Sequence, residues 1–218
     1  TGVQTCALPI FIVSECNVHP SKLKSGNINS IELQEIDRAG GLVYELPIEI
    51  KDKAAINMGH IRSKCRALHR QKKCGMVIID YLQLIAESSN GQRNREQEIS
   101  RMSREAKIIA KELNIPVILL SQLNREVDKR QDKKPILADL RESGAIEQDA
   151  DMVIFVHRPE YYGISLKDSS GNEIENYGEL IIAKHRNGAV GMVKFKHNGS
   201  LTKIFDYDTK GYLKQPPF

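Results

Sequence analysis

Residues 76–85 read MVIIDYLQLI, and this stretch decides the fold that the sequence predicts. It opens with four apolar residues, Met76 to Ile79, and an acid follows at Asp80. A continuous apolar run bounded in this way is typical of a parallel strand that is buried on both faces. Two similar runs lie further along the chain, at Pro116–Leu120 and Met152–Val156.

The segments around these strands predict helices. Residues 96–113 place Ile99, Met102, Ala106, Ile109, Ala110 and Leu113 at helical spacing. Residues 57–73 form a basic amphipathic pattern, with Ile61, Cys65 and Leu68 on the apolar side. The alternation of strands and helices therefore predicts an α/β fold with a mostly parallel sheet flanked by helices.

The two ends of the chain follow other patterns. Residues 18–40 predict short helices, the second capped by Ser30 and ended by Gly40 and Gly41, and Pro47–Ile50 predicts a short strand. After a polar loop over residues 163–178, three turn-separated runs predict C-terminal antiparallel hairpins: Glu179–Lys184, Gly191–Lys196 and Leu201–Phe205.

The composition excludes several classes of protein. The 218 residues are 40% hydrophobic and 28% charged, which excludes disordered, collagen-like and disulfide-scaffold proteins. No run of 18 apolar residues is present, so no membrane span is predicted. The cysteines fit no zinc spacing, and Cys65 is expected to be a buried free thiol in a reducing compartment. A net charge of +4 does not by itself indicate a nucleic-acid partner.

Polar residues follow two of the predicted strands at their carboxyl ends. These are Asp80, after the first strand, and Gln122, after the second. In open α/β sheets, ligands bind beyond the carboxyl ends of the strands. An acid at such a position has the Walker B arrangement, in which a carboxylate holds the Mg²⁺ of a nucleotide. Taken alone the pattern is weak, because an Asp at a strand end is more often a turn or helix-cap residue.

Four motifs occur together and in order. They are DYLQLI at 80–85, SQLNREVDKR at 121–130, DLRESGAIEQDAD at 139–151 and AKHRNG at 183–188. Together they resemble the RecA-like motor domain of replicative hexameric DNA helicases of the DnaB type. The resemblance covers residues 12–207. Residues 1–11 are then expected to be a segment outside the family, such as an assembly scar, and residues 208–218 a C-terminal tail.

The resemblance implies a role for each matching residue. Asp80 corresponds to the acid on Mg²⁺, and Gln122 to a sensor between nucleotide and DNA. Lys184 corresponds to the residue that, with an arginine finger matching Arg186, reaches a neighbouring subunit's γ-phosphate. The residues that match the grip on single-stranded DNA are Arg141, Glu142 and Gly144.

The same resemblance implies the cofactors, partners and location. The expected cofactors are ATP and Mg²⁺, and the expected activity is 5′→3′ DNA unwinding at the replication fork in the cytoplasm. The expected partners are single-stranded DNA, five further copies in a homo-hexamer and, for the parent protein, primase and a helicase loader, with no membrane.

Each role has a structural alternative. Arg141 and Glu142 could form a surface ion pair, worth about 0–1 kcal/mol. Lys184 and Arg186 could be solvated hairpin charges, and Gln122 could cap a helix or turn. The basic residues between Arg62 and Lys73 are expected to be a solvated helix face, with a subunit contact as the second reading.

One expected motif is missing from the sequence. A motor of this class needs a P-loop, G-x-x-x-x-G-K-[ST], and the chain contains no Gly-Lys dipeptide. The family's catalytic glutamate is missing as well. We therefore expect the chain to be the C-terminal part of a helicase and inactive alone. The alternatives are a non-hydrolysing remnant that binds single-stranded DNA or helicase subunits, and a RecA-like recombination or repair ATPase.

Overall fold

The computed structural model describes residues 7–52, 56–85, 95–167, 170–200 and 203–207, without the side chains of residues 7, 95 and 141–144. The chain divides into two compact units. Unit 1 comprises Thr1–Asp52, Ile164–Gly178 and Lys194–Phe218, and unit 2 comprises Lys53–Gly163 and Glu179–Val193. Within the described part of the chain, no helix is long and apolar enough to cross a membrane.

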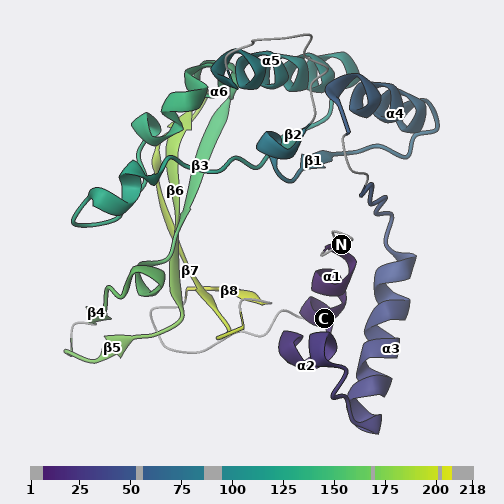
Figure 1. Ribbon diagram of the computed structural model, residues 1–218, viewed down its shortest axis with the longest axis vertical. Helices are drawn as coiled ribbons and strands as arrows, with labels where there is room; N and C mark the ends of the chain where they lie inside the picture. Colours follow the sequence, from purple (N-terminus) through teal and green to yellow (C-terminus); the bar gives the residue numbers. More distant parts are fainter. Residues whose placement is uncertain (1–6, 53–55, 86–94, 168–169, 201–202, 208–218) are drawn as a thin grey trace. The chain divides into compact units, whose positions relative to one another are not determined.

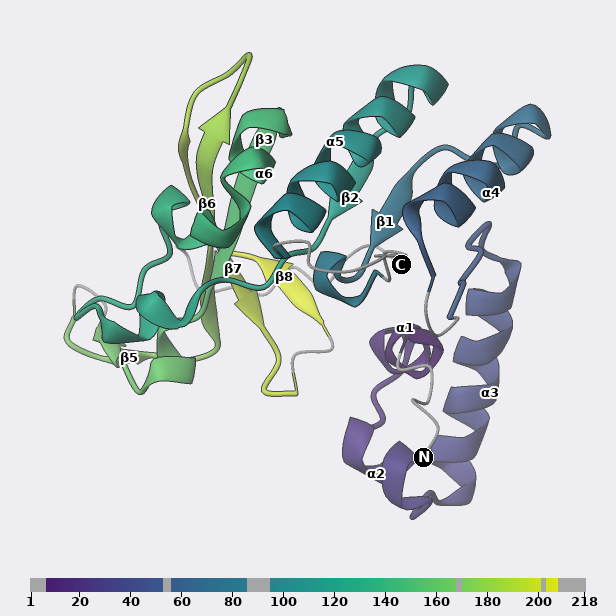
Figure 2. The ribbon, with the colours of Figure 1, turned by 45° about the horizontal axis from the view of Figure 1, so that its top comes forward.

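Unit 2 contains the two strands that the sequence predicts most directly. Strand β1 (Val77–Ile79) pairs in parallel with β2 (Val117–Leu119), with Val77 opposite Val117. Helices α4 (Met58–Arg70) and α5 (Arg95–Leu113) pack beside this pair, as Figures 1 and 2 show. The short 3₁₀ helix η1 (Leu82–Leu84) follows β1 directly.

The main core of unit 2 confirms the predicted helix faces. Ile99, Met102 and Ile109 of α5 are almost fully buried, each at 1% exposure or less. Burial of such a side chain stabilises a fold by about 1.5–3 kcal/mol. On α4, Asn57 is the N-cap and Cys65 is buried as a free thiol, which raises its pKa to about 11 because burial disfavours the thiolate.

The prediction that these strands are buried on both faces is wrong. Ile78 is 61% exposed and Ile118, its partner in register, is 44% exposed. Ile79, which points to the other face, is buried in the core with α4 and α5. The helices thus cover one face of the β1–β2 pair, and the apolar run of sequence does not distinguish the covered face from the open one.

Two arginines of α4 hold one carboxylate of α5. Arg62 Nη2 donates to Glu112 Oε2 at 2.7 Å, and Arg66 Nε donates to Glu112 Oε1 at 2.5 Å. This arrangement gives part of the basic face of α4 a structural partner. The hydrogen bonds from Arg66 and Arg62 lower the pKa of Glu112 from 4.5 to about 2.

Because this pKa is lowered on folding, the pairing should stabilise the fold above pH 4.5 and be lost as the pH falls toward 2. A carbon-13 NMR titration of the chain should show Glu112 titrating near pH 2. Replacement of Arg66 by methionine should raise that midpoint. A wild-type midpoint near the ordinary value would show that the pairing does not persist in solution.

A second sheet has the order β3-β6-β7-β8, and its β3–β6 and β7–β8 pairs are antiparallel. Its strands are β3 (Met152–His157), β6 (Tyr177–His185), β7 (Gly191–His197) and β8 (Ile204–Asp206). The predicted C-terminal hairpins are therefore confirmed. Among the described strands, parallel pairing is confined to β1 and β2.

The segment predicted as a polar loop contains a small hairpin, and a short helix precedes it. Helix η4 (Pro159–Tyr162) ends at Gly163, whose φ of 69° suits glycine. Strand β4 (Leu166–Lys167) then pairs with β5 (Glu173–Ile174). These strands are only two residues long, and no apolar alternation in the sequence indicated them.

A buried polar group joins β3 to β6. His157 and Glu179 lie opposite each other in register, and His157 Nδ1 is 3.2 Å from Glu179 Oε2. Lys134 Nζ approaches the same carboxylate oxygen at 2.9 Å. Since the side chains of His157 and Glu179 are only 2% and 6% exposed, these contacts satisfy a carboxylate that would otherwise be costly to bury.

The backbone of Gly178 in β6 lies close to the side chain of Phe195 in β7. A Cβ atom at this position would lie 2.1 Å from Cζ of Phe195 in β7. Phe195 is itself buried, so its ring has little room to move aside. The absence of a side chain at residue 178 is thus what allows the ring to lie against the strand.

The helices of unit 1 differ from the prediction at their ends. They are α1 (Ala7–Glu15), α2 (Pro20–Ser25) and α3 (Ser30–Glu45). Asn29, not Ser30, caps α3, through a capping box with Glu32. The helix continues through Gly40 and Gly41 because Ala39 and Val43 are buried on its inner face, which offsets the cost of about 1 kcal/mol per glycine.

The strand predicted at Pro47–Ile50 is not formed, and these residues are irregular. Pro47 has no N–H to donate to a neighbouring strand, and Ile48 is 47% exposed. Without a partner or a buried face, the short apolar run does not become a strand.

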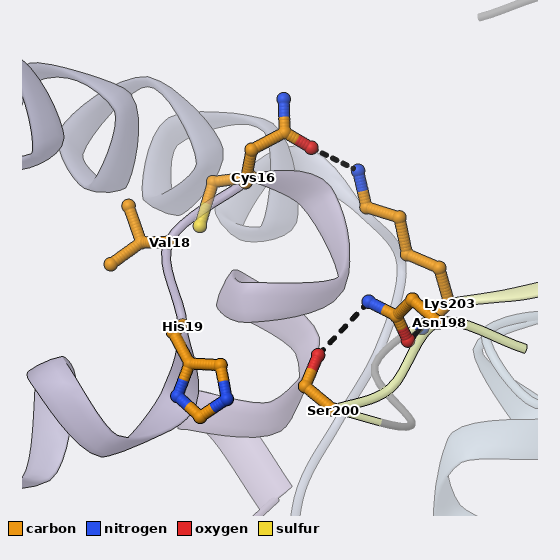
Figure 3. A pocket seen from close by; sticks show the side chains of 7 residues that line it. Cys16, Val18, His19, Asn198, Ser200 and Lys203 are labelled. Atoms are coloured by element: carbon orange, nitrogen blue, oxygen red, sulfur yellow. Dashed lines mark hydrogen bonds between the residues drawn. The ribbon is translucent and has the colours of Figure 1, made fainter.

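Unit 1 also contains a small polar cavity of about 130 Å³, which Figure 3 shows. It is lined by the segment 16–19 and by Asn198, Ser200 and Lys203. Lys203 Nζ donates to Asn17 Oδ1 at 3.0 Å, and Asn198 Nδ2 donates to Ser200 Oγ at 3.0 Å. None of the site residues predicted from the sequence lines this cavity.

Candidate functional site

Asp80 and Gln122 lie at the same edge of the parallel pair. Asp80 follows β1 directly, and Gln122 follows β2 after two residues, so both stand at carboxyl ends of adjacent strands. Both residues are exposed. The backbone continues the pairing past the strands, since Leu82 N donates to the carbonyl of Leu120 at 2.9 Å. The structure therefore brings these two predicted residues to one edge.

Gln83 links the two strand ends. Its Nε2 donates to Ser121 Oγ at 3.0 Å and to the carbonyl of Gln122 at 3.4 Å, and its Oε1 accepts from Gln122 N at 3.3 Å. Sequence reasoning assigned no role to Gln83. The available signal was its place inside the DYLQLI motif, three residues after Asp80.

An ion pair joins the second motif to the third. Arg130 follows the 3₁₀ helix η2 (Arg125–Lys129), and Asp139 lies in η3 (Leu137–Ser143). Both guanidinium Nη atoms of Arg130 donate to the carboxylate, with Nη1 to Oδ1 at 2.9 Å. Burial raises the pKa of Asp139, but the hydrogen bonds from Arg130 and from Ile136 N outweigh burial and hold the pKa below 3.8.

The residues predicted to contact DNA lie at a junction of two helices. Arg141 and Glu142 stand in the last part of η3, and Gly144 begins α6 (Gly144–Asp149). Their side chains lie outside the described residues. The backbone thus places Arg141 and Glu142 just before α6 and Gly144 at its first position, and Ile146 of α6 is buried in the main core with α5.

Lys184 and Arg186 meet the other end of α6. Lys184 lies in β6, and its Nζ donates to the carbonyls of Glu147 and Gln148, the latter at 3.5 Å. Arg186 follows β6, and its Nη2 donates to the carbonyl of Gln148 at 3.3 Å. Both cations therefore have backbone partners at the C-terminal end of a helix, where positive charge is favourable.

Asp151 completes this cluster. Its Oδ1 lies 3.0 Å from Arg186 Nη1, and its carbonyl accepts from Arg186 N at 2.8 Å. Lys107 of α5 donates to the other carboxylate oxygen. The hydrogen bond from Lys107, the largest influence, lowers the pKa of Asp151, with smaller contributions from the charges of Arg186 and Lys111. Sequence reasoning did not assign Asp151 a role.

At the strand edge Asp80 supplies a carboxylate that would bind a metal ion only together with other ligands. Within the described residues, no group of three His, Cys, Asp or Glu side chains is placed to hold a metal ion. Mg²⁺ is commonly bound by one or two carboxylates, with phosphate oxygens and water as the remaining ligands. A single exposed carboxylate at a strand end therefore fits an Mg²⁺ ion that arrives with a nucleotide.

The fold and this edge define a class of α/β proteins that bind ligands beyond the carboxyl ends of their parallel strands. A model of one family, the DnaB-like helicase C terminal domain, matches residues 8–206. The chain belongs to this family. The family predicted from the four motifs is therefore confirmed.

Relatives of known name agree with this assignment. The chain is 46% identical to the replicative DNA helicase DnaC of Bacillus subtilis (strain 168) and 45% identical to the replicative DNA helicase DnaB of Geobacillus stearothermophilus. In both comparisons the match covers 84% of this chain and 39% of the relative. The chain thus spans about two fifths of the length of these relatives.

Two solved structures confirm the predicted RecA-like fold. The ATPase domain of G40P is 37% identical, with a TM-score of 0.81 over 92% of this chain and 70% of that one. A DnaB-like replicative helicase, studied for its interactions with primase, is 36% identical, with a TM-score of 0.83 over 95% of this chain and 50% of that one.

Proposed function

We propose that this chain is the C-terminal part of the motor of an ATP-dependent replicative DNA helicase that unwinds DNA 5′→3′ at the replication fork. The observation that carries the proposal is the family match over residues 8–206. The names of the relatives point to the same activity. The activity belongs to the longer protein, and the chain by itself is proposed to hydrolyse no ATP.

The strand edge supports a nucleotide-binding role. In this proposal Asp80 would hold the Mg²⁺ of ATP, and Gln122, whose backbone N–H and carbonyl are bonded to the Gln83 amide, stands at the end of the adjacent strand. When bound, Mg²⁺ neutralises the charge that develops on the phosphate oxygens. Because the Gln83 amide bonds the two strand ends to each other, a displacement at one end is transmitted to the other.

Lys184 and Arg186 are proposed to act on a neighbouring subunit's nucleotide. Arg186 is 48% exposed, so its guanidinium is accessible to a second molecule. A guanidinium placed at the γ-phosphate stabilises the charge of the transition state, and when it comes from another subunit it requires an assembly. This is the reason for proposing a homo-hexamer as the active form.

Arg141, Glu142 and Gly144 are proposed to hold single-stranded DNA through its phosphates. A glycine three residues after an arginine permits close approach of the backbone to a phosphate, a contact that is independent of sequence and sensitive to salt. Primase and a helicase loader are proposed as partners of the parent protein. One of the similar solved structures concerns the interactions of such a helicase with primase.

Fork unwinding by the full-length protein tests this proposal. With ATP and Mg²⁺, the protein should displace the strand of a forked duplex that has a free 5′ tail, and a fork with only a 3′ tail should remain intact. The 218-residue chain, assayed in parallel, should show no ATP turnover above background. Absence of unwinding by the full-length protein would refute the helicase assignment, and turnover by the chain would refute its proposed inactivity.

Replacement of Arg141 by alanine should weaken the binding of single-stranded DNA by the full-length protein. If Arg141 neutralises one phosphate, the slope of log K against log salt should become shallower by about one unit. Fluorescence anisotropy over a salt series measures both quantities. Arg101→Ala, which removes an exposed arginine paired with Glu105 on α5, is the matched control and should leave the slope unchanged. An unchanged slope for Arg141→Ala would remove this residue from the DNA site.

A further inference from the structure

Two polar clusters meet at the C-terminal end of α6. The carbonyls of Glu147 and Gln148 accept from Lys184, and Gln148 also accepts from Arg186. Asp151, two residues after the helix, pairs with Arg186 at 3.0 Å and with Lys107 of α5. Every group in this set belongs to unit 2.

The geometry of α6 makes it a short rigid connection. The helix has six residues, which at 1.5 Å per residue corresponds to about 9 Å. Its first residue is Gly144, the last of the three residues proposed to contact DNA. The last carbonyls of a helix lack partners within the helix. Here they accept hydrogen bonds from Lys184 and from Arg186, the proposed finger. One helical segment therefore touches the proposed DNA site at one end and the proposed finger at the other.

Asp151 is the residue of this cluster that binds both the backbone and the side chain of Arg186. Its backbone carbonyl accepts from Arg186 N at 2.8 Å while its carboxylate pairs with the guanidinium, so main chain and side chain are both held. The register of β3 against β6 places Met152 opposite His185, which brings residues 151 and 186 together. The pairing with Lys107 fixes the carboxylate from a third element.

We propose that Asp151 is a positioning residue: it holds Arg186 against the end of α6 and thereby couples the placement of the finger to the segment that binds DNA. This inference rests on the proposed function of Arg186. Asp151 itself contacts neither nucleotide nor DNA in this scheme. It acts by fixing the position of the Arg186 guanidinium when bound DNA shifts the first residues of α6.

Replacement of Asp151 by asparagine in the full-length protein tests the proposal. Because misplacement of a catalytic group by about 1 Å can cost up to about 100-fold, DNA-stimulated ATP turnover should fall about tenfold. The KM for ATP should stay within about twofold, because Asp151 does not bind substrate. Asp151→Glu, which restores a carboxylate, should recover at least half of the lost rate. Glu105→Gln, a matched loss of an ion-paired carboxylate on α5, should have no effect.

A second readout does not depend on turnover. In the 218-residue chain labelled at arginine, the Nη–H protons of Arg186 should exchange with water several-fold faster in Asp151→Asn than in the wild type or in Asp151→Glu, because Nη1 is the atom that faces Asp151. Asp151 is 61% exposed, so the variant is expected to fold, and thermal unfolding checks this. If Asp151→Asn does not fold, Asp151→Ser takes its place in both measurements.

The outcomes separate this inference from the proposed function. Loss of turnover in Arg186→Ala, with normal DNA stimulation in Asp151→Asn, would overturn the positioning role alone. Unchanged turnover in Arg186→Ala would instead overturn the proposed finger. A folded Asp151→Asn variant that Asp151→Glu fails to rescue, or in which KM rises as much as kcat falls, would also overturn the positioning role.

Discussion

Replacement of Arg186 by alanine should reduce DNA-stimulated ATP hydrolysis by the full-length protein about 1,000-fold or more, because arginine fingers contribute that much to turnover. The guanidinium presents several donors in one plane, which matches the oxygens of a transferring phosphoryl group. Arg186 is held at the end of α6 but is only half-buried, so it is both oriented and accessible.

Steady-state hydrolysis with saturating single-stranded DNA measures this effect. Arg186→Lys keeps the charge but loses the planar fork, and it should recover little of the rate. Arg101→Ala, which loses an exposed arginine of similar accessibility, is the control and should remain active. Mixed rings of wild-type and Arg186→Ala subunits should lose activity as the variant fraction rises, because each site is completed by its neighbour. A loss of less than tenfold in the pure variant would contradict the role.

Replacement of Arg130 by methionine should lower the free energy of unfolding by about 3 kcal/mol or more, since removal of one partner leaves a buried charge uncompensated. The side chain of Asp139 is 2% exposed, and Arg130 meets it with both Nη atoms. The backbone of the same residue is also engaged, because Asn124 N donates to the carbonyl of Asp139 at 3.1 Å. The pair therefore joins the second and third motifs at a buried point.

Urea denaturation of the 218-residue chain measures this loss. Lys129→Met is the matched control, because it removes an exposed ion pair with Glu126, and it should cost less than about 1 kcal/mol. The pH dependence gives a second check. The pKa of Asp139 in the folded wild type lies below 3.8, so the stability it contributes is present above pH 3.8 and is lost below that pH.

In Arg130→Met the balance changes, since burial, which raises the pKa of Asp139, is then opposed by the hydrogen bond from Ile136 N and no longer by Arg130. The variant should therefore become relatively more stable as the carboxyl is protonated, and its difference from the wild type should shrink in acid. A difference that is constant down to pH 3 would show that the loss comes from packing of the arginine stem instead.

The elements that the sequence predicted well are those whose side chains repeat along one face. Ile99, Met102 and Ile109 recur at helical spacing and are all buried on α5. The prediction failed where the burial of a residue depends on whether another helix or strand packs over it. Ile78 belongs to the same apolar run as Ile79, and only the packing of α4 and α5 determines that one is open and the other covered. Likewise, burial of Ala39 carries α3 through two glycines.

The same distinction applies to the candidate site: the position of a residue at a strand end could be predicted, and contacts that depend on packing could not. Asp80 and Gln122 could be placed at one edge in advance, because parallel strands end on the same side of a sheet. The contacts of Asp151 could not. Its partner Lys107 is 44 residues away in the sequence, and the pairing depends on how α5 lies against the start of β3. Gln83 was missed for a similar reason, because its amide acts across a strand pair.

The contact between Gly178 and Phe195 has a consequence for how this sequence can drift over time. Even the methyl group of an alanine at position 178 would stand 2.1 Å from the ring, so residue 178 is not free to change while Phe195 is present. A substitution at 178 becomes acceptable only after residue 195 has lost its ring. Lineages that keep the phenylalanine are therefore committed to the glycine, whatever happens to the exposed residues around them.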